Sequence, residues 1–78
     1  MQSITVSTYL SEGVIAARLA QIQVEFSEVE IGSYPFVRDG KLGTSLVARH
    51  EDTQPLARVQ IALTEMIKSF GGVIAGDN

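Results

Sequence analysis

The sequence predicts an α+β fold, a two-layer β-α-β-β-α sandwich whose three-stranded, mostly antiparallel sheet carries two helices on one face. Segments that alternate apolar and polar residues flank a tight turn, as paired strands do. Two other segments repeat apolar residues every three or four positions, as amphipathic helices do, and such helices need a sheet face to cover. With 78 residues the chain forms one domain, 1–78, with an expected ordered core at 3–72. Because the strand pattern begins at once, we expect a C-terminal fragment of a longer protein.

The first two elements are a strand and a helix. Residues 3–10, SITVSTYL, are rich in β-branched and aromatic types, and Ile4 and Val6 alternate with polar residues. Ser11 can cap a following helix, which we place at Glu12–Phe26. The apolar face of this helix comprises Ile15, Leu19, Ile22 and Phe26.

A β-hairpin follows, with strands at Val29–Arg38 and Leu42–Arg49. The linker between them is so short that the strands must pair antiparallel, and Gly40 can take the positive φ that such a turn requires. Pro35 cannot donate to a ladder, which places its strand at a sheet edge. We therefore predict the strand order 1-3-2, with the third strand central.

A second helix lies within residues 51–72. Asp52 or Thr53 can cap it, Pro55 suits its first turn, and Gly71 suits the left-handed position that ends it. The predicted apolar stripe comprises Leu56, Val59, Leu63, Met66, Ile67 and Phe70. The tail from Val73 onward is expected to be loose, with Val73 and Ile74 able to dock.

Composition limits the classes of function. A net charge of −3 and a pI near 4.9 argue against nucleic acid as a partner, because non-specific binding to nucleic acid requires a basic surface. The chain has no cysteine, which excludes disulfides and thiolate metal sites and fits a reducing compartment. No secretory signal or membrane-spanning run is visible, so we expect a cytoplasmic protein with no membrane partner.

The motif GKLG, between Gly40 and Gly43, allows two interpretations. It has the form of the GxxG loop with which KH domains clamp a nucleic-acid backbone. That mechanism needs the loop between two helices, whereas these glycines flank the turn of a hairpin. We expect Gly40 to turn the chain and Gly43 to permit a bulge or close packing.

Few residues offer chemistry. His50 has no nucleophile at a defined spacing and is expected in a solvent-facing loop, and no metal-ligand motif occurs. Tyr34, Arg38, Lys41 and Arg49 are candidate ligand-binding residues, since aromatic and cationic groups on one hairpin can stack a base and hold a phosphate. The alternative is that the cations are only solvated and that Tyr34 or Phe36 belongs to the core.

The residues 30–56 resemble a known family. The features are Ile31–Phe36 (IGSYPF), Asp39–Lys41 (DGK) and Thr44–Arg49 (TSLVAR). They resemble the KH-type segment that follows the molybdopterin-binding (MoaB/MogA-like) domain of the bacterial competence/damage-inducible CinA proteins, whose relatives include the corresponding part of eukaryotic FAD synthases. The resemblance implies that molybdopterin or nucleotide chemistry belongs to the parent domain and that this chain holds no cofactor or catalytic residue of its own.

Two functions follow from these observations. The first is a non-catalytic accessory module that packs on its MoaB/MogA-like parent domain or on a second copy in a homo-oligomer. The second is a small module for nucleotides or single-stranded nucleic acid that uses the basic and aromatic hairpin surface. An independent enzyme would need several converging groups in a pocket, and the sequence shows no such set.

Overall fold

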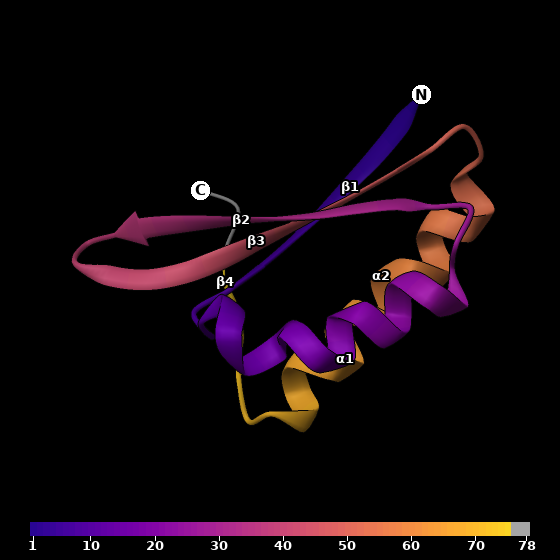
Figure 1. Cartoon of the computed structure of the whole chain (residues 1–78). Coiled ribbons are helices and arrows are strands. Elements are labelled where there is room, and N and C mark those ends of the chain that lie inside the picture. The colour runs from indigo at the N-terminus through magenta and orange to yellow at the C-terminus, as the bar shows by residue number, and fades with distance from the viewer. Residues whose placement is uncertain (76–78) are drawn as a thin grey trace.

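The computed structural model describes residues 1–75 as two layers, a four-stranded antiparallel sheet with both helices on one face (Figure 1). The elements in chain order are β1 (Gln2–Thr8), α1 (Glu12–Glu25), β2 (Glu30–Arg38), β3 (Lys41–His50), α2 (Thr53–Ser69) and β4 (Ile74–Ala75). The predicted α+β class and the placement of both helices on one face are confirmed.

The sheet has the order β2-β3-β1-β4, so β3 is central between its two antiparallel neighbours, as predicted. The short strand β4 was not predicted, because two residues are too few to show an alternating pattern. Ala75 and Ile74 of β4 pair with Ser7 and Thr8. The buried hydroxyl of Thr8 donates to the carbonyl of Val73 at 3.0 Å, which holds β4 against β1.

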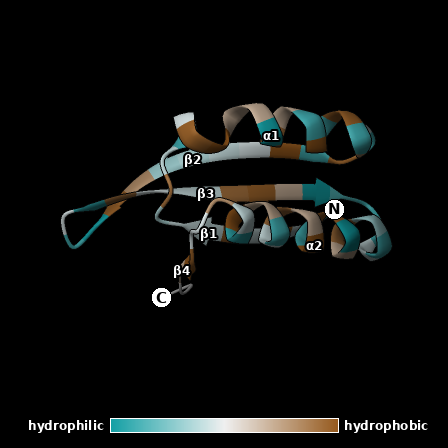
Figure 2. Cartoon of the chain, turned by 90° about the horizontal axis from the view of Figure 1, so that it is seen from below, coloured by the Kyte–Doolittle hydropathy of each residue, from teal (hydrophilic) through white to brown (hydrophobic). Residues whose placement is uncertain are grey.

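The core lies between the sheet and the helices. Figure 2, seen from the helix side, shows α1 beside β2, α2 beside β1, and apolar residues of β3 between the two helices. The core side chains from the sheet and from α2 are Val6, Leu46, Ala48, Leu56, Val59, Leu63, Met66 and Ile67. Phe70, which the sequence assigned to the same stripe, is the residue that ends α2 and stays exposed.

The C-terminus of α2 follows the predicted glycine stop. Gly71 has φ +76°, and its N–H donates to the carbonyl of Lys68 at 3.0 Å. The N–H of Gly72 donates to the carbonyl of Ile67, also at 3.0 Å. This pair of bonds is a Schellman motif, which satisfies carbonyls that the last helical turn leaves free.

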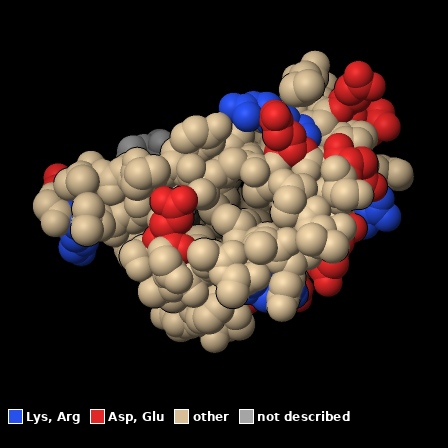
Figure 3. Space-filling model, viewed as in Figure 1, with Lys and Arg blue, Asp and Glu red and all other residues tan. Residues whose placement is uncertain are grey.

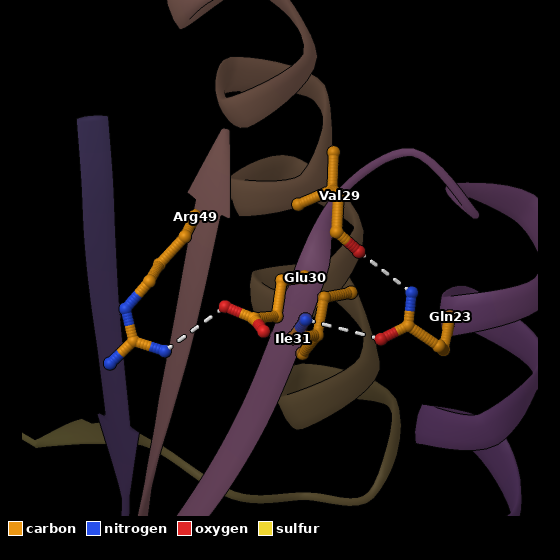
Figure 4. A network of polar contacts seen from close by, with 5 residues as sticks. All are labelled: Gln23, Val29, Glu30, Ile31 and Arg49. Atoms are coloured by element: carbon orange, nitrogen blue, oxygen red, sulfur yellow. Dashed lines mark hydrogen bonds and ion pairs between the residues drawn. The ribbon is translucent and has the colours of Figure 1, made fainter. Parts of the chain in front are cut away.

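At the free edge of β2, the side chain of Gln23 bonds backbone groups, and no further strand of residues 1–75 pairs there (Figure 4). Gln23 of α1 donates from Nε2 to the carbonyl of Val29 at 2.8 Å, and its Oε1 accepts the N–H of Ile31 at 3.1 Å. The N–H of Ile31 therefore points away from β3. Because this direction repeats every second residue, the nitrogen of Pro35 also faces outward, and the proline removes no ladder bond. The predicted edge position of Pro35 is confirmed.

Replacing Gln23 by leucine should lower the free energy of unfolding by about 1–3 kcal/mol, since it leaves buried backbone groups without partners. Urea denaturation measures the effect. The matched control is Gln21→Leu, because Gln21 is exposed and bonds only the side chain of Arg18 among the described contacts. Equal stability losses in both variants would contradict the edge-closing role.

Replacing Leu63 by alanine should cost about 2–5 kcal/mol, because Leu63 is fully buried in the centre of the α2 stripe. The control Ile61→Ala, at a residue 59 % exposed, should change stability by about 0.5 kcal/mol or less. A loss below about 0.5 kcal/mol for Leu63→Ala would show that α2 packs by another face.

Candidate interaction face

The helices leave one face of the sheet open, and we call it the outer face. Successive strand residues point to opposite faces. Because Val6, Leu46 and Ala48 are buried beneath the helices, their neighbours along each strand point the other way. The aromatic and cationic residues that this alternation places on the outer face are Tyr9, Tyr34, Phe36, Arg38, Lys41 and Arg49.

Near the hairpin turn, Phe36 and Tyr9 meet across β3. Their ring centres are 5.8 Å apart in an edge-to-face arrangement. Phe36 pairs with Gly43 of β3, and a Cβ at Gly43 would collide with the Phe36 ring and lie 2.6 Å from the carbonyl oxygen of Thr8. Because Gly43 has no side chain, the Phe36 ring can pack directly against the backbone of β3.

The two cations beside the turn lie against these rings. The guanidinium carbon of Arg38 is 5.0 Å from the centre of the Phe36 ring, and Nζ of Lys41 is 5.8 Å from the centre of the Tyr9 ring. Such cation–π contacts stabilise by roughly 0.5–1 kcal/mol at exposed sites. The rings and cations therefore form an ordered layer rather than independent solvated chains.

Tyr34 and Arg49 form a second group nearer the start of β2. The Tyr34 ring lies over Gly32, where a Cβ would be 3.0 Å from the tyrosine hydroxyl. Hydrogen bonding with Tyr34 raises the pKa of the Arg49 guanidinium, and the Glu30 carboxylate raises it further. The Arg49–Glu30 ion pair is 3.4 Å long and solvent-exposed, as Figure 4 shows. Tyr34 itself is 48 % exposed.

The structure thus brings the four predicted candidates to one face but divides them. Arg38 and Lys41 lie beside the turn, whereas Tyr34 and Arg49 lie further along the hairpin. The expectation that Tyr34 or Phe36 belongs to the core is wrong, because both lie on the face that the helices do not cover. The sequence reasoning did not single out Tyr9, although it continues the alternation of Ser3, Thr5 and Ser7.

The GKLG segment turns the chain. Asp39 and Gly40 both have positive φ, 53° and 78°, as in the hairpin turns whose twist matches paired strands. Gly40 and Gly43 therefore belong to a strand–turn–strand unit, and no helix starts at this loop to face a phosphate. The comparison of this segment with a KH clamp is wrong for that reason.

His50 has a structural contact. It is the last residue of β3, not a loop residue as expected, and its Nδ1 accepts the N–H of Asp52 at 2.9 Å. This bond orients the turn that leads into α2. Across residues 1–75, no cluster of three or more His, Asp or Glu side chains is placed to hold a metal ion.

The cavities are shallow. One, of about 320 Å³, adjoins the outer face at Glu30 and Arg49 and is also lined by Met1, Glu28, His50 and Glu51. A second, of about 260 Å³, lies between α1 and β2 and is lined mainly by Ala16, Leu19, Ala20 and Ile31, with Glu12 at its rim. Figure 3 shows a hollow on this side of the molecule, within a largely uncharged surface. Another, of about 440 Å³, lies between α1 and α2. Within the described part of the chain, neither helix has the length and apolarity to cross a membrane.

Replacing Gly43 by alanine should lower the free energy of unfolding by about 1–3 kcal/mol, because the new methyl group overlaps the Phe36 ring and the backbone of Thr8. Thermal denaturation measures the change. The control is Gly13→Ala in the first turn of α1, where nothing lies within 4 Å of the new methyl group. Gly13→Ala should raise the free energy of unfolding by up to about 1 kcal/mol. If Gly43→Ala left the free energy of unfolding unchanged, close packing of Phe36 on Gly43 would be contradicted.

Comparison with known proteins corrects the family resemblance. The family model described as FAD synthase, middle domain, matches residues 1–73, and no curated protein or solved structure matches the chain. The assignment to a KH-type segment of a CinA-like, molybdopterin-binding protein is therefore wrong. It depended on the hairpin motifs, whose glycines serve local packing of Tyr34 and Phe36. The match includes both helices and all of β1, β2 and β3, so the chain belongs to the FAD synthase middle-domain family.

Proposed function

We propose that this domain is a non-catalytic interaction module, and that its outer face docks against another part of a FAD synthase-type protein. The observation that carries the proposal is the ordered layer of Tyr9, Phe36, Arg38 and Lys41, with Tyr34 and Arg49 beside it, on a sheet face that no other described element covers. The family match suggests a FAD synthase-type parent protein. The arrangement of the aromatic and cationic side chains suggests the outer face as the docking surface.

The composition of the layer supports a protein partner. Tyrosine, arginine and phenylalanine are enriched at the centres of protein interfaces, and tyrosine and arginine dominate energetic hot spots. A residue that is already fixed loses less side-chain entropy on binding, and association commonly costs about 0.5–1.5 kcal/mol for each long side chain that becomes immobile. The cation–π contacts of Arg38 and Lys41 and the ion pair of Arg49 with Glu30 reduce that cost.

The same face is less suited to a nucleotide or a nucleic-acid strand. Arg49 already pairs with Glu30, and Arg38 and Lys41 already lie against aromatic rings. The cavity at Glu30 and Arg49 is shallow, and four carboxylate or imidazole side chains line it, including Glu28 and Glu51, which disfavour a phosphate. The net charge of −3 also opposes the counterion release that drives binding to phosphates. A protein surface is therefore a better partner for the outer face than a nucleotide. The cytoplasmic location stays a prediction from the sequence.

Binding should be measured by titrating a FAD synthase that lacks its middle domain into the ¹⁵N-labelled chain. Amide shifts should centre on β2 and β3 residues of the outer face. Tyr34→Ala should weaken the binding at least about tenfold, the loss expected for a hot-spot residue.

The matched control is Leu42→Ser, which changes an exposed side chain on the opposite face of the same hairpin. It should leave the affinity unchanged. Shifts confined to the helices, or equal losses in both variants, would contradict docking through the outer face. A titration with AMP and a short single-stranded RNA should leave the spectrum unchanged, and shifts at Tyr34 and Arg38 would favour the nucleotide module instead.

A further inference from the structure

Among residues 1–75, the outer edge of β1 pairs with another strand over only part of its length. β4 pairs only with Ser7 and Thr8, so the segment Gln2–Val6 has no strand beyond it among the described residues (Figure 1). An exposed row of backbone N–H and C=O groups is a template for another strand.

The two edges of the sheet differ in how they are protected. At the edge of β2, Pro35 removes a donor, Gln23 occupies the groups of Val29 and Ile31, and Ser33 donates to Glu12 at 2.8 Å. In the part of the chain that the structure describes, the edge of β1 before Ser7 has none of these devices. Its residues, QSITV, include no proline, glycine or charged residue, and Ile4, Thr5 and Val6 are β-branched.

The register shows which groups of β1 are free. The N–H of Ile31 points away from β3, so Ile31 and its partner Ala48 share no backbone hydrogen bond. The backbone N–H and C=O of Ala48 therefore point toward β1. Ala48 pairs with Ile4, so Ile4 bonds inward. The backbone N–H and C=O of Ser3 and Thr5 therefore point away from β3. Those of Ser7 point the same way, and Ser7 pairs with Ala75 of β4.

We propose that a second copy of this chain binds here, with the two β1 strands antiparallel about a twofold axis. An antiparallel pair of identical strands is self-complementary, as a twofold interface requires. With Ile4 opposite Ile4 of the second copy, Ser3 of each chain meets Thr5 of the other, and the outward groups of both residues are bonded. Among the described residues, β4 limits this pairing to Gln2–Val6.

The charge pattern favours this occupant. A strand pairs with its own copy only where like charges do not face each other, and Gln2–Val6 is neutral. The flank of α2 above this edge is also neutral along its first turns. The core residues of α2 face the sheet and Arg58, Ala62 and Glu65 face α1. At 100° per residue, Ala57, Gln60 and Thr64 therefore face away from α1, toward the β1 edge.

The spacing of the helices fits as well. α2 packs against both β1 and β3. Neighbouring strands are about 4.8 Å apart. Because α2 lies over both β1 and β3, the α2 helices of the two copies would lie about 10 Å apart on either side of the twofold axis. This is close to the usual distance of about 8–10 Å between packed helices, and small side chains such as Ala57 permit it.

Two measurements on the whole chain test the proposal. Light scattering after gel filtration should give a mass that rises with concentration toward twice 8.4 kDa. In hydrogen exchange, the amides of Ser3 and Thr5 should become protected as concentration rises, whereas Ile4, bonded to β3, should be protected at all concentrations. Thr5→Pro should raise the dissociation constant at least about tenfold, because it removes an outward donor without removing a bond to β3.

The matched control is Val37→Pro, which makes the same change at an outward-facing position of the opposite edge and should leave association unchanged. Should Thr5→Pro fail to fold, Thr5→Glu tests the same contact by charge repulsion, with Val37→Glu as its control. A monomer at every concentration overturns the proposal, as does protection of Ser3 and Thr5 that is independent of concentration. Docking to a FAD synthase through Tyr34 is a separate readout that does not depend on these outcomes.

Discussion

The pairing of β3 on both sides governs the architecture. Because Lys41–His50 hydrogen-bonds to β2 on one side and β1 on the other, its inward residues Leu46 and Ala48 form the centre of the core. The two helices cover that face and no more. The outer face and the two sheet edges are left to be closed by side chains, by β4 or by another molecule.

The chain closes these surfaces unequally. At the β2 edge, Gln23 takes the place of a neighbouring strand and Pro35 removes a donor. On the outer face, Gly32 and Gly43 leave room for Tyr34 and Phe36 to lie against the sheet, and Arg38 lies over the Phe36 ring. The described residues give the β1 edge no such protection before Ser7. Residues 1–75 thus leave two surfaces with different chemistry uncovered, an aromatic and cationic face and a neutral strand edge.

The sequence was sufficient for features that depend on local chemistry. Apolar periodicity predicted both helices, Asp39 and Gly40 predicted the turn, Pro35 predicted an edge, and Gly71 predicted the end of α2. Features that depend on contacts distant in sequence were not predictable. The bond from Gln23 to β2, the pairing of β4 and the contact of Tyr9 with Phe36 each join segments whose proximity only the fold creates. Phe70 was misplaced because periodicity does not show where a helix leaves the sheet.

The chain belongs to the FAD synthase middle-domain family, and the docking proposed above would cover the open face of its sheet. The most direct measurement is the broadening of NMR signals by a soluble nitroxide in the isolated chain. Ring protons of Tyr34 and Phe36 should be strongly broadened, while the methyl groups of Leu46 and Leu63 should be protected. Equal protection on both faces would contradict the account.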